Sequence, residues 1–238
     1  MVNKWSNIGH SWLFPVDCLY CGGKVVGQLA LCDFCRQSLR RNNSACTRCA
    51  EPLADSQFQV MCGKCLKKTP EYDQVLSPYL YQPPISTLVT RFKYHADLGA
   101  GYILGKLLAA YLQEQRAPLP ECIVPVPLHS SRLRQRGFNQ SLELSRILGK
   151  HLTVPVLQNI CVRHRQTESQ SGLNEKQRKQ NIRGAFSTSA TLPYQHIAIV
   201  DDVMTTGNTA NELAKILRKA GAETIQVWSV CRASNWKV

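Results

Sequence analysis

Eight of the eleven cysteines lie within the first 65 residues, and they constrain this chain more than any other feature. They form four C-x-x-C pairs, at 18–21, 32–35, 46–49 and 62–65. In a reducing compartment such pairs bind metal or serve redox chemistry, and four copies without a thioredoxin-like βαβ context favour zinc. The segments 18–35 and 46–65 look like two copies of one unit, each too small to hold together without a metal.

Two sets of four thiolates are therefore expected to hold two structural zinc ions. Pairs that are neighbours along the chain would form one site from the first two pairs and another from the last two. An interleaved arrangement, first pair with third and second with fourth, is the alternative. The ligands in both cases are Cys18, Cys21, Cys32, Cys35, Cys46, Cys49, Cys62 and Cys65. The remaining Cys122, Cys161 and Cys231 fall in expected strands and are interpreted as small core residues.

The rest of the chain has the pattern of an α/β domain. Strand-like runs alternate with helical periods, and several of the runs are apolar throughout. This pattern indicates a parallel sheet covered on both faces. We expect a cysteine-rich domain over 1–70 and an α/β domain over 71–238. The expected strands are 72–82, 122–127, 154–164, 196–200 and 223–233, and the expected helices are 83–95, 101–116, 138–152 and 208–222.

Hydropathy and charge limit the classes of partner. No run of about 18 apolar residues exists, so no integral membrane protein is expected. The first residues lack the apolar stretch of a signal peptide, which favours a cytoplasmic location. The formal net charge is +13, and residues 130–184 carry eleven Lys and Arg against three Glu. Polyanions are therefore plausible partners.

The segment IAIVDDVMTTGNT (197–209) runs from an apolar strand into two carboxylates and a glycine turn. Ligands of parallel sheets bind outside the carboxyl ends of strands, where the two acids would stand. The turn exposes backbone amides and the following helix adds a positive dipole, which together form a phosphate cradle. Carboxylates beside it would accept hydrogen bonds from sugar hydroxyls. The segment therefore predicts a ribose 5-phosphate site, formed by Asp201, Asp202, Thr205, Thr206, Gly207, Asn208 and Thr209.

Plainer interpretations of this segment compete with that prediction. The acids could merely cap a helix, with the glycine permitting a turn. The acidic strand of a P-loop ATPase would require G-x-x-x-x-G-K-[ST], which the sequence lacks. The glycines of GAGYILG (99–105) follow FKYHADL rather than a buried strand, so no nucleotide fingerprint is expected there.

The 197–209 segment resembles the phosphoribosyl-pyrophosphate (PRPP) motif of type I phosphoribosyltransferases. Other segments extend the resemblance to the ComF (GntX-like) family, which joins an N-terminal zinc ribbon to a phosphoribosyltransferase-like domain. These segments cover nearly the whole chain in order: FKYHADL (92–98), VPVPLHSSRLRQRGFNQS (124–141), RHRQTESQSGL (163–173), and Arg178 and Asn181 followed by GAF (184–186). The resemblance implies a double zinc ribbon over 1–70 and a parallel-sheet phosphoribosyltransferase-like domain over 71–238.

The resemblance also implies roles for individual residues. Asp201 and Asp202 would meet the ribose 2′ and 3′ hydroxyls, while 205–209 would wrap the 5-phosphate. Magnesium would bridge pyrophosphate and ribose hydroxyls, held mostly by substrate and water. The polar segment 163–176 would close over the site as a flexible loop. The pyrophosphate loop would use Leu128, His129, Arg132 and Arg136, and the flexible loop Arg163, Arg165, Thr167 and Gln170.

The same basic segments have alternative interpretations. Arg132, Arg134 and Arg136 could form a solvated charged face, but their alternation does not fit one stripe of a helix, which favours ligand binding. Asn139 and Gln140 could be a helix cap. The side chains of His129 and His164 are interpreted as having no special role, and His129 would contribute only its backbone to the pyrophosphate loop.

ComF proteins are associated with natural transformation, in which imported single-stranded DNA is handled on the cytoplasmic side of the inner membrane. The resemblance thus implies a competence-type protein that assists DNA uptake and binds PRPP and single-stranded DNA, with the uptake machinery as a partner. No segment has the pattern of a base-recognition hood, so the sequence does not decide whether the protein catalyses phosphoribosyl transfer. The alternative is a phosphoribosyltransferase (pentosyl transfer) of nucleotide salvage. A PRPP-sensing regulator on double-stranded DNA is disfavoured, because no helix-turn-helix is visible.

Overall fold

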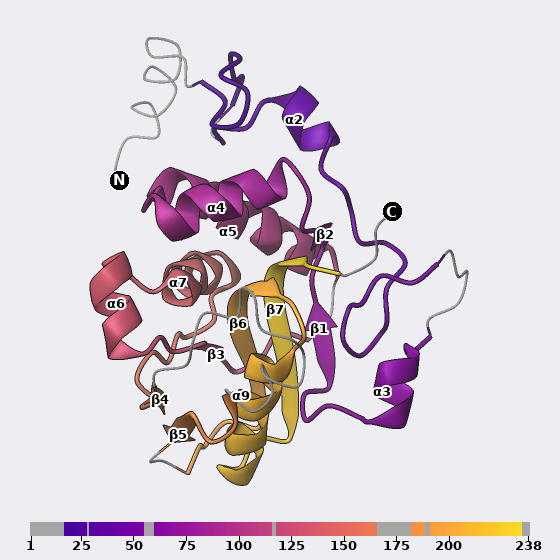
Figure 1. The fold of residues 1–238 in the computed structure, drawn as a ribbon, viewed down its shortest axis with the longest axis vertical. Helices are drawn as coiled ribbons and strands as arrows, with labels where there is room; N and C mark the ends of the chain where they lie inside the picture. The colour runs from indigo at the N-terminus through magenta and orange to yellow at the C-terminus, as the bar shows by residue number, and fades with distance from the viewer. Residues whose placement is uncertain are drawn as a thin grey trace, which may run out of the picture.

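The computed structural model describes residues 17–27, 29–54, 60–115, 118–165, 182–188 and 191–234 (Figure 1). Its centre is a parallel sheet in the order β1-β7-β6-β3, with β2 also paired to β7. The parallel-sheet α/β fold that the sequence predicts is confirmed. The five strands are β1 (Gln74–Leu76), β2 (Tyr79–Leu80), β3 (Cys122–Pro125), β6 (His196–Met204) and β7 (Thr224–Arg232).

Helices cover both faces of this sheet. Along β6, Ala198 and Val200 point into one buried cluster with the apolar sides of α4, α5 and α7, whereas Ile197 and Ile199 point into a second cluster with α9. This alternation follows from the two-residue period of a strand. Both faces are apolar, which explains why the strands read as continuous apolar runs. The helices are α4 (Ile85–Tyr94), α5 (Leu98–Glu114), α7 (Gln140–Leu152) and α9 (Asn208–Lys219).

The strand β6 extends further than its neighbour β3, and this places the acid pair. The last residue of β3, Pro125, pairs with Val200, while β6 continues to Met204 paired with β7 alone. The strand expected from the sequence ends at residue 200, four residues before the observed end. Asp201 and Asp202 therefore lie within β6, at the sheet edge left open by the end of β3.

Residues 154–164, predicted as a single strand, form two separate pieces. Val156 makes an isolated bridge to Ile123, and a turn then separates it from β4 (Cys161–Arg163). The strand β4 pairs antiparallel with β5 (Phe186–Thr188) in a second, two-stranded sheet. The polar Gln158 and Asn159 fall in the intervening turn. The prediction of one strand through the apolar residues on both sides of them is therefore wrong.

The arginine-rich segment, which the family resemblance implies to be part of a loop, is helical. It forms α6 (Ser130–Arg136), which begins after the capping residue His129 and ends at Gly137 with φ +79°. None of its residues is buried. A helix without a buried face needs no apolar stripe, so the missing stripe does not exclude a helix here.

The two cysteine units pack against opposite faces of the sheet domain. The first, with α2 (Asp33–Gln37), lies beside α4 and shares a buried cluster with α4 and α5 (Figure 1). The second, with α3 (Gly63–Lys67), lies beside β1 and joins the cluster on the α9 face. The boundary near residue 70 stays a prediction. Within the described segments, every helix is too short or too polar to cross a membrane.

Candidate functional site

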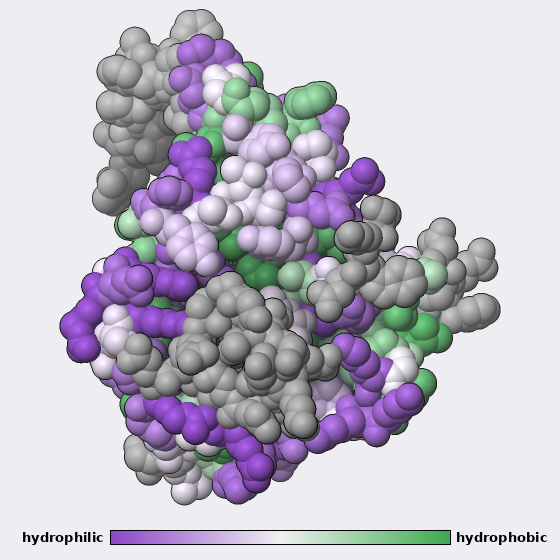
Figure 2. All heavy atoms as spheres, in the orientation of Figure 1, coloured by the Kyte–Doolittle hydropathy of each residue, from purple (hydrophilic) through white to green (hydrophobic). Residues whose placement is uncertain are grey.

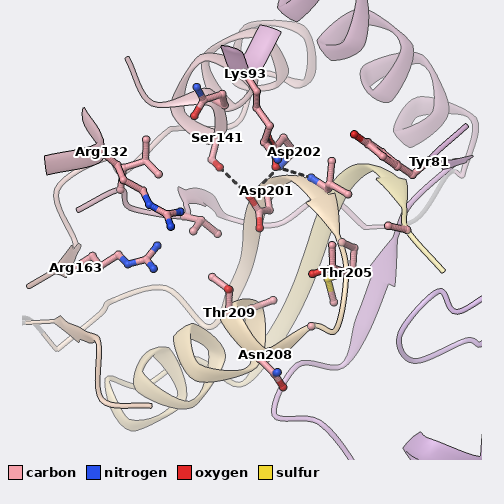
Figure 3. A pocket seen from close by; sticks show the side chains of 18 of the residues that line it. Tyr81, Lys93, Arg132, Ser141, Arg163, Asp201, Asp202, Thr205, Asn208 and Thr209 are labelled. Carbon is pink, nitrogen blue, oxygen red and sulfur yellow. Dashed lines mark hydrogen bonds and ion pairs between the residues drawn. The ribbon is translucent and has the colours of Figure 1, made fainter. Parts of the chain in front are cut away.

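A cavity of about 340 Å³ opens at the carboxyl ends of β3 and β6 (Figure 3). It brings the acid pair and the glycine turn, which are neighbours in the sequence, together with arginines from the distant elements α6 and β4. Figure 3 shows the acids between the turn and the arginines. The predicted site residues on its wall are Leu128, Arg132, Arg136, Arg163, Asp201, Asp202, Thr205, Gly207, Asn208 and Thr209.

The acid pair is held by partners from two helices. Ser141 Oγ, at the start of α7, donates to Asp201 Oδ1 at 3.1 Å, and Lys93 Nζ, at the end of α4, lies 2.7 Å from Asp202 Oδ2. Two backbone amides also donate to the pair: Asp202 N to Asp201 Oδ1, the oxygen that accepts from Ser141, at 2.9 Å, and Val203 N to Asp202 Oδ1 at 2.7 Å. The acids are thus fixed in orientation rather than free in solvent.

The two acids differ in electrostatic environment. Desolvation and the adjacent Asp202 raise the pKa of Asp201 to about 7, against the opposing effects of Lys93 and Ser141. Burial opposes the charge on Lys93, but the attraction of Asp202 raises its pKa above the ordinary value. Lys93 therefore supplies the counter-charge for Asp202, whereas Asp201 takes up a proton near neutral pH.

The turn that follows β6 has the geometry of an anion cradle. Gly207 has φ +78° and caps the amino end of α9, a conformation that favours glycine. The amides of Thr206, Gly207 and Asn208 donate to no other backbone group among the described residues. Together with the positive end of the α9 dipole, these amides would bind a phosphate.

Arginines form the opposite wall of the cavity. Arg163 is buried beside Arg132, and desolvation together with that neighbouring charge lowers its pKa to about 10. Arg136 donates to Gln140 Oε1 at 3.1 Å, and its guanidinium lies 5.5 Å from the ring centroid of Tyr94. Figure 2 shows that hydrophilic side chains gather over α6, which carries Arg132 and Arg136. Crowded cations of this kind favour binding of a multiply charged anion.

Several predicted site residues lie elsewhere. Thr206 lines a second cavity, behind the turn. The His129 ring caps α6 by accepting from Ser131 N at 3.2 Å. Arg165 donates to the carbonyl of Arg183 at 2.8 Å. Thr167 and Gln170 lie outside the described residues.

Sequence reasoning missed other residues on the wall. Lys93 and Tyr94 belong to the FKYHADL segment, which carried the family resemblance without an assigned role. Ser141 follows Asn139, and Asn139 does cap α7, as one interpretation expected. Tyr81 follows β2 and faces the cavity beside the turn (Figure 3). No local pattern marks Lys93 and Ser141, because they reach the acids only through the packing of α4 and α7.

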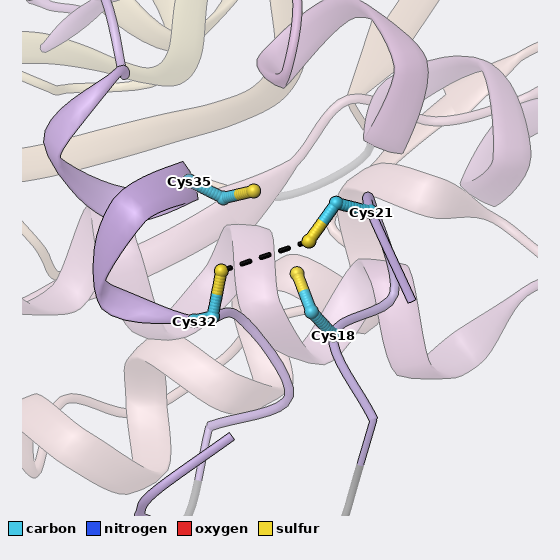
Figure 4. Close-up of side chains that lie close together, drawn as sticks. All are labelled: Cys18, Cys21, Cys32 and Cys35. Carbon is cyan, nitrogen blue, oxygen red and sulfur yellow. Dashed lines mark hydrogen bonds between the residues drawn. The ribbon is translucent and has the colours of Figure 1, made fainter. Parts of the chain in front are cut away.

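The eight paired cysteines form two clusters from neighbouring pairs. The sulfurs of Cys18, Cys21, Cys32 and Cys35 lie within 4.8 Å of one another (Figure 4), and so do those of Cys46, Cys49, Cys62 and Cys65. The interleaved alternative is therefore wrong. A zinc tetrahedron with bonds of 2.3 Å has edges of about 3.8 Å. The Cys21–Cys32 and Cys49–Cys62 sulfur distances are 3.7 and 3.6 Å, so both clusters fit structural zinc.

Backbone amides favour the thiolate form that binds metal at one cysteine of each cluster. Burial opposes ionisation of Cys18, but amides of residues 32, 21 and 20 lower the pKa of its thiol to about 6. At Cys46 burial acts the same way, and amides including that of Cys62, at 3.2 Å, lower the pKa to about 7. All four ligands in each cluster are cysteine sulfurs. A zinc ion with four protein ligands has no open coordination position, which is typical of structural rather than catalytic zinc.

Comparison with known proteins covers both parts of the chain. The double zinc ribbon domain model matches residues 10–66, and the phosphoribosyl transferase domain model matches residues 135–235. Competence protein F of Haemophilus influenzae is 37% identical over 228 residues, covering 92% of this chain and 98% of that protein. DNA utilization protein YhgH of Escherichia coli (strain K12) is 34% identical, covering 87% and 92%. Competence protein ComFC of Streptococcus pneumoniae is 27% identical, covering 91% and 100%.

Proposed function

Since the chain belongs to the ComF family of competence and DNA-utilization proteins, we propose that it assists DNA uptake in natural transformation. In this role its phosphoribosyltransferase-like domain binds PRPP and single-stranded DNA. The observation that carries the PRPP proposal is the shared cavity, where the acid pair, the glycine turn and three arginines meet. Each of the three groups matches one part of PRPP.

The 5-phosphate would lie against the turn 205–209, where the amides of Thr206, Gly207 and Asn208 and the start of α9 complement its charge. The ribose hydroxyls would donate to Asp201 and Asp202. The pyrophosphate would face Arg132, Arg136 and Arg163 across the cavity, because guanidinium groups bind phosphate in a bidentate manner. The positions of these groups support one extended ligand rather than separate ions.

Magnesium would enter with PRPP rather than occupy a preformed cage. Among the described residues, groups of three or more metal-binding side chains are limited to the two cysteine clusters. Asp202 is already paired with Lys93. A magnesium ion would therefore be held mostly by pyrophosphate, sugar hydroxyls and water, and it would neutralise charge on the pyrophosphate.

The proposed binding of single-stranded DNA depends on charge. The formal net charge is +13, and the exposed helix α6 carries three arginines beside the cavity. Contacts to phosphates provide most non-specific affinity for nucleic acid and weaken as salt rises. The basic α6 surface is thus a suitable place for a DNA strand to approach the PRPP site.

One feature favours the alternative, a phosphoribosyltransferase of nucleotide salvage. Tyr81 and Tyr94 line the cavity near the acids, where an aromatic base could stack. A base bound there would be the acceptor of the phosphoribosyl group, for which the sequence shows no recognition segment.

The two functions are separated by measuring pyrophosphate release. Purified protein with magnesium and PRPP is incubated with each nucleobase in turn, and DNA affinity is measured in parallel over a salt series. PRPP binding without base-dependent release, together with salt-sensitive binding of single-stranded DNA, is the expected result. Rapid base-dependent release would instead establish the salvage enzyme.

A matched pair of variants tests the DNA surface. Arg134→Gln removes a charge from α6 away from the cavity wall, and Arg146→Gln removes one on α7 that is paired with Glu143 at 2.7 Å. The α6 variant is expected to weaken DNA binding and reduce its salt dependence, whereas the α7 variant is expected to change it little. Equal effects would place the DNA elsewhere.

A further inference from the structure

The turn that would bind the 5-phosphate is a thin wall between two cavities. Thr205, Gly207 and Asn208 line the cavity of the acid pair on one side, and on the other side they line a second cavity of about 1110 Å³. Most buried backbone is fixed by close packing on both sides, which this turn lacks. Its position therefore depends on a few specific contacts at its ends and at its glycine.

The first of these contacts comes from Arg232, the last residue of β7. Its side chain is 6% exposed, and Nη1 donates to the carbonyl of Met204 at 2.9 Å and to that of Ala233 at 3.2 Å. Met204 is the last residue of β6 and directly precedes the turn. The guanidinium thus fixes the point at which the turn begins.

Arg232 is in turn held by the second cysteine unit. Its Nη2 pairs with Glu51 Oε2, and the other oxygen of Glu51 accepts from Ser234 Oγ at 2.9 Å. The carbonyl of Glu51 accepts from Cys46 N at 2.8 Å, which closes the turn that carries Cys46 and Cys49. A single residue therefore joins the cysteine turn to the buried guanidinium.

A second contact from the same side reaches Gly207. Tyr72 is 3% exposed and lies in the buried cluster that contains the second set of cysteines. A Cβ built on Gly207 would lie 2.8 Å from the Tyr72 hydroxyl oxygen. The neighbouring Glu71 N donates to Asn211 Oδ1 at 2.8 Å, in the first turn of α9. The segment leaving the second cysteine unit thus supports the glycine and the helix start.

From this arrangement we propose that Arg232, anchored by Glu51 of the second cysteine unit, is a positioning residue for the phosphate-binding turn. The second unit is then part of the framework of the ligand site and not only a separate folded module. The inference rests on the proposed binding of a sugar phosphate at 205–209, but the positioning of the turn can be tested without any ligand.

Hydrogen–deuterium exchange of the full-length protein tests the positioning. Glu51→Gln removes the charge that anchors Arg232 and keeps the shape of the side chain. Glu114→Gln is the control, because Glu114 pairs with Arg41 at 3.9 Å on an exposed surface. The amides that donate to this turn, Ala233 N to the Met204 carbonyl and Asn211 N to the Gly207 carbonyl, both at 2.8 Å, are expected to exchange faster in Glu51→Gln than in wild type or the control, since local opening raises exchange. Unchanged exchange would overturn the proposal, whether or not the protein binds PRPP.

Calorimetric titration with PRPP and magnesium tests the consequence for the ligand. The Kd of Glu51→Gln is expected to rise about tenfold while the zinc content stays at that of wild type. A Kd equal to that of wild type, in a protein whose wild type binds PRPP, would contradict the positioning role. If wild type itself fails to bind PRPP, the proposed function is wrong and the exchange result alone decides the positioning role.

A conservative variant covers the case in which Glu51→Gln loses zinc. Arg232→Lys keeps a positive charge opposite Glu51 but has no fork to reach the Met204 carbonyl at the same time. It is expected to retain zinc, to exchange faster at the amides of Ala233 and Asn211 and to bind PRPP more weakly. Exchange like that of wild type would show that the fork does not position the turn.

Discussion

Lys93 Nζ lies 2.7 Å from Asp202 Oδ2, so a helix that precedes the central strands provides the counter-charge for an acid on β6. Two residues earlier, Arg91 donates to the carbonyl of Leu19, within the first C-x-x-C pair. The end of α4 therefore contacts the first cysteine unit and the acid pair at once. Both cysteine units therefore contact the sheet domain: the first on the side of α4 and α5, and the second on the side of α9.

Replacing Lys93 by methionine is expected to lower the free energy of unfolding by about 3 kcal/mol, because the change leaves a buried carboxylate without its partner. Urea denaturation measures this value. The double variant Lys93→Met/Asp202→Asn is expected to recover a large part of the loss. As a control, Arg146→Met breaks an exposed pair and should cost less than about 1 kcal/mol. Equal losses in the two single variants would show that the Lys93 pair is not buried.

The pKa of about 7 for Asp201 predicts that this residue makes the protein less stable as pH rises. In the unfolded chain the carboxyl loses its proton near its ordinary pKa of 3.8, whereas in the folded protein it keeps the proton up to about 7. The folded state binds more protons across this window, so stability falls as pH increases through it. Thermal denaturation of wild type and Asp201→Asn from pH 5 to 8 measures the effect. The stability advantage of the variant should grow with pH, and a constant difference would refute the raised pKa.

Gly207→Ala is expected to be more harmful than Gly137→Ala. Both glycines have positive φ, +78° and +79°, so alanine costs about 1–2 kcal/mol of backbone strain at each. At Gly137 the added Cβ meets open space, whereas at Gly207 it lies 2.8 Å from the Tyr72 hydroxyl oxygen. Chemical denaturation should show the larger loss for Gly207→Ala, with partial recovery when Tyr72→Phe is added. Equal losses would mean that the turn can move away from Tyr72.

Cys18→Ser is expected to reduce the zinc content from two ions per chain to one and to unfold the first cysteine unit, because metal binding and folding are linked. Mass spectrometry of metals gives the stoichiometry. Cys161→Ala changes a buried cysteine that belongs to neither cluster and should retain both ions. A Cys18→Ser protein with two zinc ions would refute the assignment of the first cluster.

The features predicted best from the sequence are local ones. The C-x-x-C pairs lie close along the chain, and the acids, glycine turn and helix start of 201–209 follow each other directly. The spacing of residues therefore predicts the cysteine sites and the phosphate-binding segment. The alternation of apolar strands and helices predicts the parallel sheet. The pairing of the clusters was left open, because sequence spacing alone does not choose between neighbouring and interleaved pairs.

What the sequence did not predict depends on packing between distant segments. Lys93 and Ser141 reach the acids from two helices, and Arg232 reaches Glu51 across 181 residues of chain. The helix α6 lacks an apolar stripe because it has no buried face. Periodicity detects only buried faces, so it gives no signal in such a case.

The most direct test of this account is PRPP binding by wild type and Asp202→Ala, measured by titration calorimetry with magnesium. Zinc content and circular dichroism are measured on the same samples to show that both proteins are folded. We expect wild type to bind PRPP and Asp202→Ala to lose binding while keeping its zinc. Binding by the variant with the affinity of wild type would contradict the assignment of the acid pair to the ribose hydroxyls.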